Sequence, residues 1–226
     1  MRKVLCILLL LFSFSHYSYA NTSINLQPGS EGMDSFVGSG TIGSETTVLP
    51  DSNYGSDPRL IMASNCTSYI KFELPDLFTQ IWQNPLNSPV SANLLLYIES
   101  LTGSNIEIGI GYTAYQWDEN TITYDNRPFC LAIPEGKFSF DENFTGGWVS
   151  INITNFVYYW INYPTSNHGV AMSLNSADGV VVAYSSDADP EFHPILELSY
   201  HAPVPEPSVI FLCAMGLVPL LRKHKK

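Results

Sequence analysis

The sequence predicts an all-β fold, namely an antiparallel β-sandwich of jelly-roll type with one short helix. Short runs of β-branched and aromatic residues recur along the chain, and Gly, Pro, Asn and Asp separate them. Within several runs, apolar and polar residues alternate with a period of two, the pattern of a strand with one buried face. About eight to ten such strands, spaced by turn signals, are typical of a sandwich domain.

The strands are predicted in order along the chain. The first β-prone run is 46–49, which the turn-rich segment 50–58 ends. In 69–74, Ile70, Phe72 and Leu74 alternate with Tyr, Lys and Glu, which predicts one buried face. The run 93–99 is more continuously apolar, as expected for a central strand covered on both sides. The other predicted strands are 59–63, 106–110, 148–153, 170–174, 180–184 and 195–200.

Residues 154–161 break the period of two and predict a two-turn helix over one end of the sandwich. Phe156, Tyr159 and Trp160 stand at i, i+3 and i+4, Thr154 is the candidate N-cap, and Pro164 follows the end. The aromatic stripe is expected to pack into the core rather than to form a ligand platform.

Both ends of the chain carry the features of targeting segments. Residues 1–20 combine an early basic pair with a short apolar stretch and small residues at Ala20, which is the pattern of a cleaved signal peptide. A retained membrane anchor is the alternative. In 204–226, Pro205, Glu206 and Pro207 precede an apolar run and a basic tail. That run, 208–221, would span about 21 Å of a roughly 30 Å hydrocarbon core, so it is predicted to be processed rather than to stay in the membrane.

The predicted folded body is strongly acidic. Between the two targeting segments, four basic residues stand against 20 acidic ones, a formal charge of −16. Such a charge excludes nucleic acid as a partner, because phosphate binding needs clustered Lys and Arg, and it disfavours anionic membranes. Residues 21–45 are rich in Ser and Gly and are expected to be loosely ordered, so the domain is predicted to occupy 46–203.

Two cysteines, Cys66 and Cys130, lie in the predicted exported body. Disulfides persist outside the cell, so a bond between these two is expected, with a pair of buried thiols as the alternative. In the chain-entropy model, closing the 65-residue loop would stabilise the fold by about 4 kcal/mol.

The sequence shows no catalytic motif, and the protein is predicted not to be an enzyme. The exported histidines lie in no recognised catalytic context, and adjacent carboxylates in a strand point to opposite faces. Calcium is the candidate metal, because one turn offers the hard oxygen ligands of Asp51, Asn53 and Asp57. A second acidic loop offers Asp187, Asp189 and Glu191.

Carbohydrate binding would use exposed aromatic rings together with groups that hold polar substituents. Arg59, Lys71 and Arg127 are the candidates for gripping a uronate carboxylate, and Tyr69 and Tyr124 are among the candidate stacking residues.

Two parts of the chain resemble known families. The Pro-Glu-Pro, the short apolar segment and the basic tail resemble the PEP-CTERM sorting signal, which implies cleavage by an exosortase. The resemblance of 46–200 is to the DNRLRE-type domain, a jelly-roll module classed among carbohydrate-binding modules, with alginate-binding members. It rests on the following segments: Asn-Tyr-Gly at 53–55, 68–74, 92–97, the Trp-x-Glu and Thr-Ile-Thr-Tyr-x-Asn-x-Pro block at 117–128, 149–154, His-Gly-Val at 168–170, Ser-Ser at 185–186 and 194–200.

The residues of the block at 117–128 also have a structural interpretation. Trp117 is expected to be buried at a strand end, Glu119 to accept hydrogen bonds from turn amides, and Asn126 to shape a turn before Pro128. This interpretation makes the block a loop-fixing motif rather than a binding site.

Together these features predict an exported, non-catalytic protein that associates with extracellular polysaccharide. By resemblance, it works at the cell surface or in the biofilm matrix of a Gram-negative-type bacterium, and its other partner is the exosortase. It meets the membrane only transiently, through its targeting segments. The alternatives are a structural or adhesive protein that binds no sugar, and an enzyme that degrades the same polymer.

Overall fold

The structure is a computed structural model that describes residues 18–28, 32–42, 46–74, 89–174 and 179–204. The chain order begins with β1 (Ser18–Leu26), β2 (Gly32–Gly38), β3 (Gly40–Ile42), β4 (Thr46–Val48), β5 (Arg59–Ala63) and β6 (Cys66–Phe72). It continues with β7 (Pro89–Thr102), β8 (Glu107–Thr113), β9 (Cys130–Ser139) and β10 (Gly147–Asn152). The last elements are α3 (Thr154–Asn162), η1 (Pro164–Ser166), β11 (Val170–Leu174), β12 (Val180–Tyr184), η2 (Pro190–Phe192) and β13 (Ile195–Val204).

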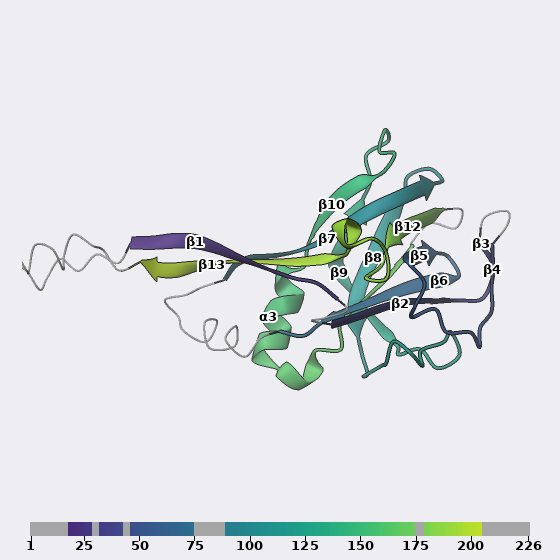
Figure 1. Ribbon diagram of the computed structural model, residues 1–226, viewed down its shortest axis with the longest axis horizontal. Coiled ribbons are helices and arrows are strands. Elements are labelled where there is room, and N and C mark those ends of the chain that lie inside the picture. Colours follow the sequence, from purple (N-terminus) through teal and green to yellow (C-terminus); the bar gives the residue numbers. More distant parts are fainter. Residues whose placement is uncertain (1–17, 29–31, 43–45, 75–88, 175–178, 205–226) are drawn as a thin grey trace, which may run out of the picture.

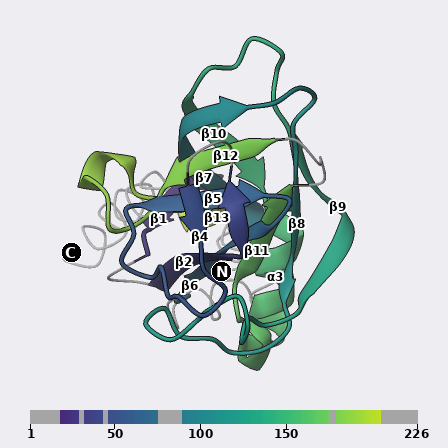
Figure 2. The same cartoon turned by 90° about the vertical axis from the view of Figure 1, so that its right-hand side faces the viewer.

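The predicted all-β antiparallel fold with one short helix is confirmed. Nine strands follow one another in the sheet order β1-β13-β7-β12-β5-β6-β11-β8-β9, and β10 and β2 are attached to β7 and β6. The pair β3–β4 forms a separate hairpin. The sheet curls, so that β7 and β10 face β6 and β11 across the interior, while α3 lies at one end (Figures 1 and 2). Jelly-roll connectivity stays a prediction.

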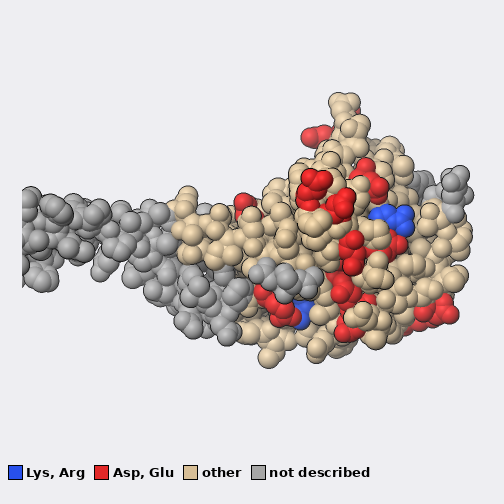
Figure 3. Space-filling view, viewed as in Figure 1, with Lys and Arg blue, Asp and Glu red and all other residues tan. Residues whose placement is uncertain are grey.

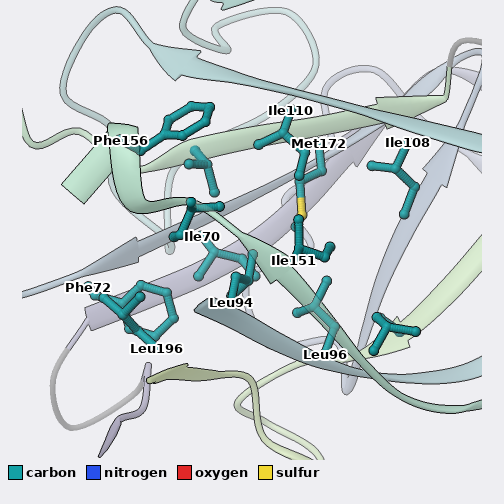
Figure 4. Packing of buried hydrophobic residues seen from close by; sticks show 14 of the residues in the cluster. Ile70, Phe72, Leu94, Leu96, Ile108, Ile110, Ile151, Phe156, Met172 and Leu196 are labelled. Atoms are coloured by element: carbon teal, nitrogen blue, oxygen red, sulfur yellow. The ribbon is translucent and has the colours of Figure 1, made fainter. Parts of the chain in front are cut away.

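The main core lies between the two halves of the curled sheet, as Figure 4 shows. Strands β6, β8 and β11 supply it from one side, β7, β10 and β13 from the other, and α3 closes it. Its buried members include Ile70, Phe72, Leu94, Leu96, Ile108, Ile110, Ile151, Phe156, Met172 and Leu196. Apolar burial on this scale is the main driving force for the fold.

The outer side of β6 is also covered, which the predicted single buried face did not anticipate. Tyr69 is only 1% exposed, although it alternates with the core residue Ile70. Trp117 and Ile122 cover it and come from residues 114–129, hereafter the long loop, which joins β8 to β9. The long loop is therefore packed onto the sheet as part of the structure.

The predicted helix at 154–161 is present as α3, and two of the three residues of its aromatic stripe pack into the core as expected. Phe156 and Trp160 are buried, whereas Tyr159 is partly exposed and its ring lies 5.0 Å from that of Tyr112. Thr154 is not the N-cap as predicted: it is the first residue of α3. Its hydroxyl instead accepts a hydrogen bond of 2.9 Å from the backbone N–H of Ala92 on β7.

The segment 21–45, expected to be loosely ordered, contains much of β1 together with β2 and β3. Strand β2 pairs with β6 along its whole length, and Phe36 and Val37 on β2 are buried. Strand β1 pairs with β13, which places Ala20, the predicted cleavage position, opposite Ala202.

The predicted sorting residues Pro205, Glu206 and Pro207 and the greater part of the predicted signal peptide lie outside the described residues. Among the residues that the structure describes, none of the helices has the length and apolarity needed to cross a membrane.

Candidate functional site

The long loop is fixed to the sheet through Trp117, which is buried as predicted. Its indole Nε1 donates a hydrogen bond of 2.8 Å to the carbonyl of His168, and its ring lies 5.7 Å from that of Tyr69. Buried indole N–H groups normally need such a partner, so this contact sets the position of the loop backbone.

The Asn53-Tyr54-Gly55 turn holds the next part of the long loop. The Asn53 side-chain amide donates to the carbonyls of Glu119 (2.7 Å) and Ile122 (2.8 Å), and its oxygen accepts from the N–H of Gly55. A Cβ atom on Gly55 would lie 2.1 Å from the Glu119 carbonyl oxygen. Only glycine fits there without a shift of the backbone.

Asn126 shapes the second half of the long loop, as predicted. Its side-chain oxygen accepts a 2.7 Å hydrogen bond from the N–H of Thr123, and its amide donates to the carbonyl of Thr121 at 2.9 Å. These contacts support the loop-fixing interpretation of the Trp-x-Glu and Asn-x-Pro block.

Glu119 accepts a backbone hydrogen bond, but from a strand instead of a turn. Its Oε1 accepts from the N–H of Asp34 on β2 at 3.1 Å. Asp34, Glu119 and Asp187 form the carboxylate cluster, in which one ligand atom from each lies within 4.8 Å of the others. The cluster therefore joins β2, the long loop and the segment after β12.

Asp34 is the buried member of the carboxylate cluster, with 0% of its surface exposed. Its Oδ2 accepts from the N–H of Ser186 at 2.9 Å, and its Oδ1 accepts from the Ser186 hydroxyl at 3.1 Å. Ser185 anchors the same turn, because its hydroxyl donates to the carbonyl of Asp57 at 2.7 Å.

Burial raises the pKa of Asp34 from 3.8 to about 7. The two hydrogen bonds from Ser186 oppose this shift, whereas the negative charges of Glu119 and Asp187 add to it. The pKa of Glu119 is also raised, first by burial. At neutral pH, the cluster therefore takes up protons more readily than isolated carboxylates do.

The carboxylate cluster is the set of described residues whose arrangement could hold a metal ion, because carboxylate oxygens are hard ligands. The sequence-predicted calcium ligands are arranged differently. The side chain of Asn53 forms the hydrogen bonds of the Asn53-Tyr54-Gly55 turn described above. The carboxylate of Asp57 accepts hydrogen bonds from the Arg59 guanidinium at 3.0 and 3.1 Å. Asp51 is exposed on the surface. Of the second predicted loop, Asp187 is the residue that joins the cluster.

A pocket opens on the outer side of β6 and β11, next to the long loop. It has a volume of about 440 Å³ and is hereafter the Arg127 pocket; its lining is Thr67, Tyr69, Arg127, Pro128, Phe129, Cys130 and Ser173. The Tyr69 hydroxyl donates a hydrogen bond of 3.1 Å to the carbonyl of Pro128, which fixes the loop at this wall. Phe129 is 67% exposed at the pocket.

Arg127 is the charged residue of this pocket. Its guanidinium carbon lies 3.5 Å from the centroid of the Tyr124 ring, and it donates a hydrogen bond to the Tyr124 carbonyl. Stacking on an aromatic ring holds a guanidinium in place while its remaining N–H groups stay available. The pocket thus combines a positioned cation with the hydroxyls of Thr67 and Ser173 and an exposed phenyl ring.

The five predicted sugar-binding residues separate into two groups. Tyr69, Tyr124 and Arg127 meet at the Arg127 pocket. Lys71 forms an ion pair with Glu73, and Arg59 forms one with Asp57. Lys137 is likewise paired with Glu107, so within the described residues Arg127 is the basic residue without a carboxylate in ion-pair contact.

The predicted disulfide between Cys66 and Cys130 is wrong, because both residues are free thiols. Cys66 lies on β6 and Cys130 on β9, and β11 and β8 stand between these strands. Three strand spacings amount to about 14 Å along the sheet, whereas a disulfide requires Cα atoms within about 7 Å. Burial instead raises the pKa of the Cys66 thiol to about 12.

Sequence reasoning missed several residues of both sites. Asp34 stood in the segment expected to be loosely ordered, and Phe129 follows a turn motif that gave no sign of exposure. Ser173 belongs to the predicted strand 170–174, and Thr67 precedes the predicted strand 69–74, but their pairing across β6 and β11 depends on sheet order. Only the acidic loop at 187–191 carried a signal for the carboxylate cluster.

The comparison with protein families gives one finding. The model of carbohydrate-binding module family 96 matches residues 33–200, which include most of β2, all of β3 to β12 and most of β13. A comparison with curated proteins gives no match. The matched range contains both the Arg127 pocket and the carboxylate cluster.

Proposed function

The chain belongs to carbohydrate-binding module family 96, and we propose that it is an exported, non-catalytic protein that binds extracellular polysaccharide. The observation that carries the choice of site is the Arg127 pocket. It holds the one described basic residue without an acidic partner, on a body whose predicted formal charge is −16. On the face seen in Figure 3, acidic side chains are more prominent than basic ones. A guanidinium without a carboxylate partner is therefore a distinctive feature of this acidic protein.

The chemistry of the pocket suits a sugar that carries a carboxylate. Arg127 offers N–H groups in a planar fork, which matches the two oxygens of a uronate. Phe129 offers an exposed ring to the C–H face of the sugar, and the hydroxyls of Thr67 and Ser173 complement sugar hydroxyls. The backbone around the pocket is already fixed by Tyr69 and Trp117, so little ordering would be required on binding.

The burial of Asp34, one of the three carboxylates of the cluster, supports a non-catalytic role. Acid–base cleavage of a glycosidic bond needs two carboxyl groups that reach the substrate. Asp34 is fully buried and is hydrogen-bonded to Ser186, so it is not placed to contact a polymer.

The two ends of the chain support export. The predicted signal peptide would direct the chain out of the cytoplasm, and the predicted sorting tail would bring an exosortase to Pro205, Glu206 and Pro207. The place of action would then be the cell surface or the biofilm matrix. Contact with the membrane would be limited to these targeting segments.

Affinity electrophoresis of the full chain tests the proposed function. Gels that contain alginate, or a neutral glucan, are run with calcium and with a chelator. Retention by at least one polymer is expected. Loss of one charge-assisted hydrogen bond of about 1.5 kcal/mol would weaken binding of a uronate polymer about tenfold in Arg127→Ala.

Lys137→Ala is the matched control, since it removes the same charge from an exposed residue outside the pocket that is ion-paired with Glu107. It should bind like the wild type. If the folded protein is retained by no polymer under any of these conditions, the proposal is wrong and a structural or adhesive role takes its place. Release of sugar from either polymer would refute the non-catalytic assignment.

A further inference from the structure

A second cluster of aromatic side chains lies on the opposite side of the sandwich from the Arg127 pocket. Tyr97 on β7 alternates with the core residues Leu96 and Ile98, so it points outward from the core. Trp148 on β10 stands directly opposite Tyr97 in the antiparallel register. Leu96 and Ile98 on β7 share one core with Ile70 and Phe72 on β6, so this core separates the outer side of β7 from the outer side of β6.

Four rings from four elements make up this cluster, hereafter the aromatic face: Tyr97, Trp148, Tyr184 and Phe192. The ring of Tyr97 lies 5.5 Å from Trp148, edge to face, and 4.6 Å from Phe192. Tyr184 stacks on Phe192 at 4.9 Å. Each ring is thus held by its neighbours, which lowers the entropy cost of binding a ligand.

The exposed ring of the aromatic face is Trp148, of which 44% is open to solvent. The other two tryptophans in the described ranges, Trp117 and Trp160, are buried at 7% and 1%. Because Trp148 is continuous with the other rings of the aromatic face, it belongs to a patch, and contiguous apolar patches mark interaction surfaces more often than scattered single residues do.

The polar surroundings of the aromatic face are acidic. Glu99 follows on the same outward side of β7, and its charge is one cause of the raised pKa of Tyr184, after the loss of solvation. Asp189 contributes in the same direction. A basic residue, Arg59, stands opposite Tyr184 in the register of β12 with β5, but its guanidinium is already ion-paired with Asp57. Carboxylates accept hydrogen bonds from sugar hydroxyls, but they repel the carboxylate of a uronate.

We propose that the aromatic face is a second sugar-binding surface, which takes uncharged hexose units through stacking on Trp148 and hydrogen bonds to Glu99. This inference rests on the proposed function and extends it. The charge near each site determines the class of ligand. The Arg127 pocket suits an anionic sugar, whereas the carboxylates of Glu99 and Asp189 near Tyr184 disfavour an anionic sugar and leave a neutral one as the ligand. The protein would then hold two polymer segments of different charge on opposite sides.

Fluorescence titration of the full chain tests this inference, because Trp148 is the solvent-exposed tryptophan of the described ranges. The probes are cellohexaose, mannohexaose and hexagalacturonate. At least one neutral probe should shift the tryptophan emission, and Trp148→Ala should weaken its binding about tenfold or more, as measured by calorimetry. Trp148→Phe keeps a ring at this position and should retain part of the affinity.

The controls separate this inference from the proposed function. Tyr158→Ala removes an aromatic residue that is 56% exposed on α3 and should change nothing. Arg127→Ala should weaken the binding of hexagalacturonate and leave the binding of the neutral probe unchanged. If only hexagalacturonate binds, the second surface is refuted and the first stands. If Trp148→Ala binds the neutral probe as the wild type does, the second surface is refuted, and the effect of Arg127→Ala on hexagalacturonate decides the first. If no probe binds, both proposals fail. If Trp148→Ala alters only the sedimentation of the protein, the face is an interface between copies.

Discussion

Replacement of Asp34 by asparagine should remove a large part of the pH dependence of folding stability. Asp34 is buried, and its pKa is raised from 3.8 to about 7. The folded chain therefore binds a proton more tightly at this carboxyl than the unfolded chain does. The stability that this group contributes is fully present below about pH 4 and is lost as the pH rises through about 7.

The size of the effect follows from the shift. A difference of about three pKa units corresponds to about 4 kcal/mol between the two ends of this pH range, since one unit is 1.36 kcal/mol. This value is an upper limit, because local relaxation lets water reach the ionised group. Between pH 5 and 8.5, the free energy of unfolding should fall far less in Asp34→Asn than in the wild type. At pH 8.5 the variant should be more stable than the wild type.

Urea unfolding of the full chain, followed by tryptophan fluorescence at several pH values, measures both slopes. A chelator is present throughout, so that no cation held by the carboxylates contributes. Asp125→Asn is the matched control, because it makes the same chemical change at an exposed position of the long loop. A wild-type stability that rises with pH across this range, or equal slopes for Asp34→Asn and the wild type, would refute the reasoning.

Three further predictions concern the packing of the long loop and of β6. Gly55→Ala should destabilise the fold by about 1–3 kcal/mol in urea unfolding, since its Cβ would lie 2.1 Å from the Glu119 carbonyl oxygen; unchanged stability would contradict this close approach. Tyr69→Phe should cost about 1–2 kcal/mol, because the carbonyl of Pro128 loses its donor, and amide exchange in the long loop should speed up; protection equal to wild type would speak against it. Alkylation followed by peptide mapping should modify Cys66 after unfolding without reductant, and only slowly in the native protein, where burial raises the thiol pKa to about 12; a disulfide-linked peptide would overturn the free-thiol assignment.

The strands and the helix were largely predictable because their signals are local. The runs at 59–63, 170–174 and 180–184 became β5, β11 and β12 with the same bounds, and 154–161 became α3. Strand β9 was missed, since Pro134 and Gly136 interrupt its apolar pattern, and β2 was missed because its segment is rich in Ser and Gly. These two strands are formed through pairing with β8 and β6, which a local pattern does not contain.

The sites were less predictable, because they bring together residues that are far apart in the sequence. Asp34 meets Ser186 only through the order of β2, β6, β5 and β12 in the sheet. The Trp-x-Glu block was correctly interpreted as fixing a loop, since the bonding capacity of Trp117 and Asn126 is a property of the residues themselves. The prediction of the disulfide was wrong because it rested on a general property of the compartment. A disulfide can persist outside the cell, but this does not make β6 and β9 neighbours in the sheet.

The pairing of β1 with β13 brings the first and last described residues of the chain together. These strands run side by side from Leu26 and Leu196 to Ser18 and Val204, and Figure 1 shows them extending from one side of the body. The first and last described residues therefore leave the fold together, away from β10 and from the long loop. A molecule held at this side of the fold would have its attachment point away from β10, which carries Trp148, and away from the long loop, which carries Arg127. Attachment there would leave both proposed sugar-binding surfaces accessible.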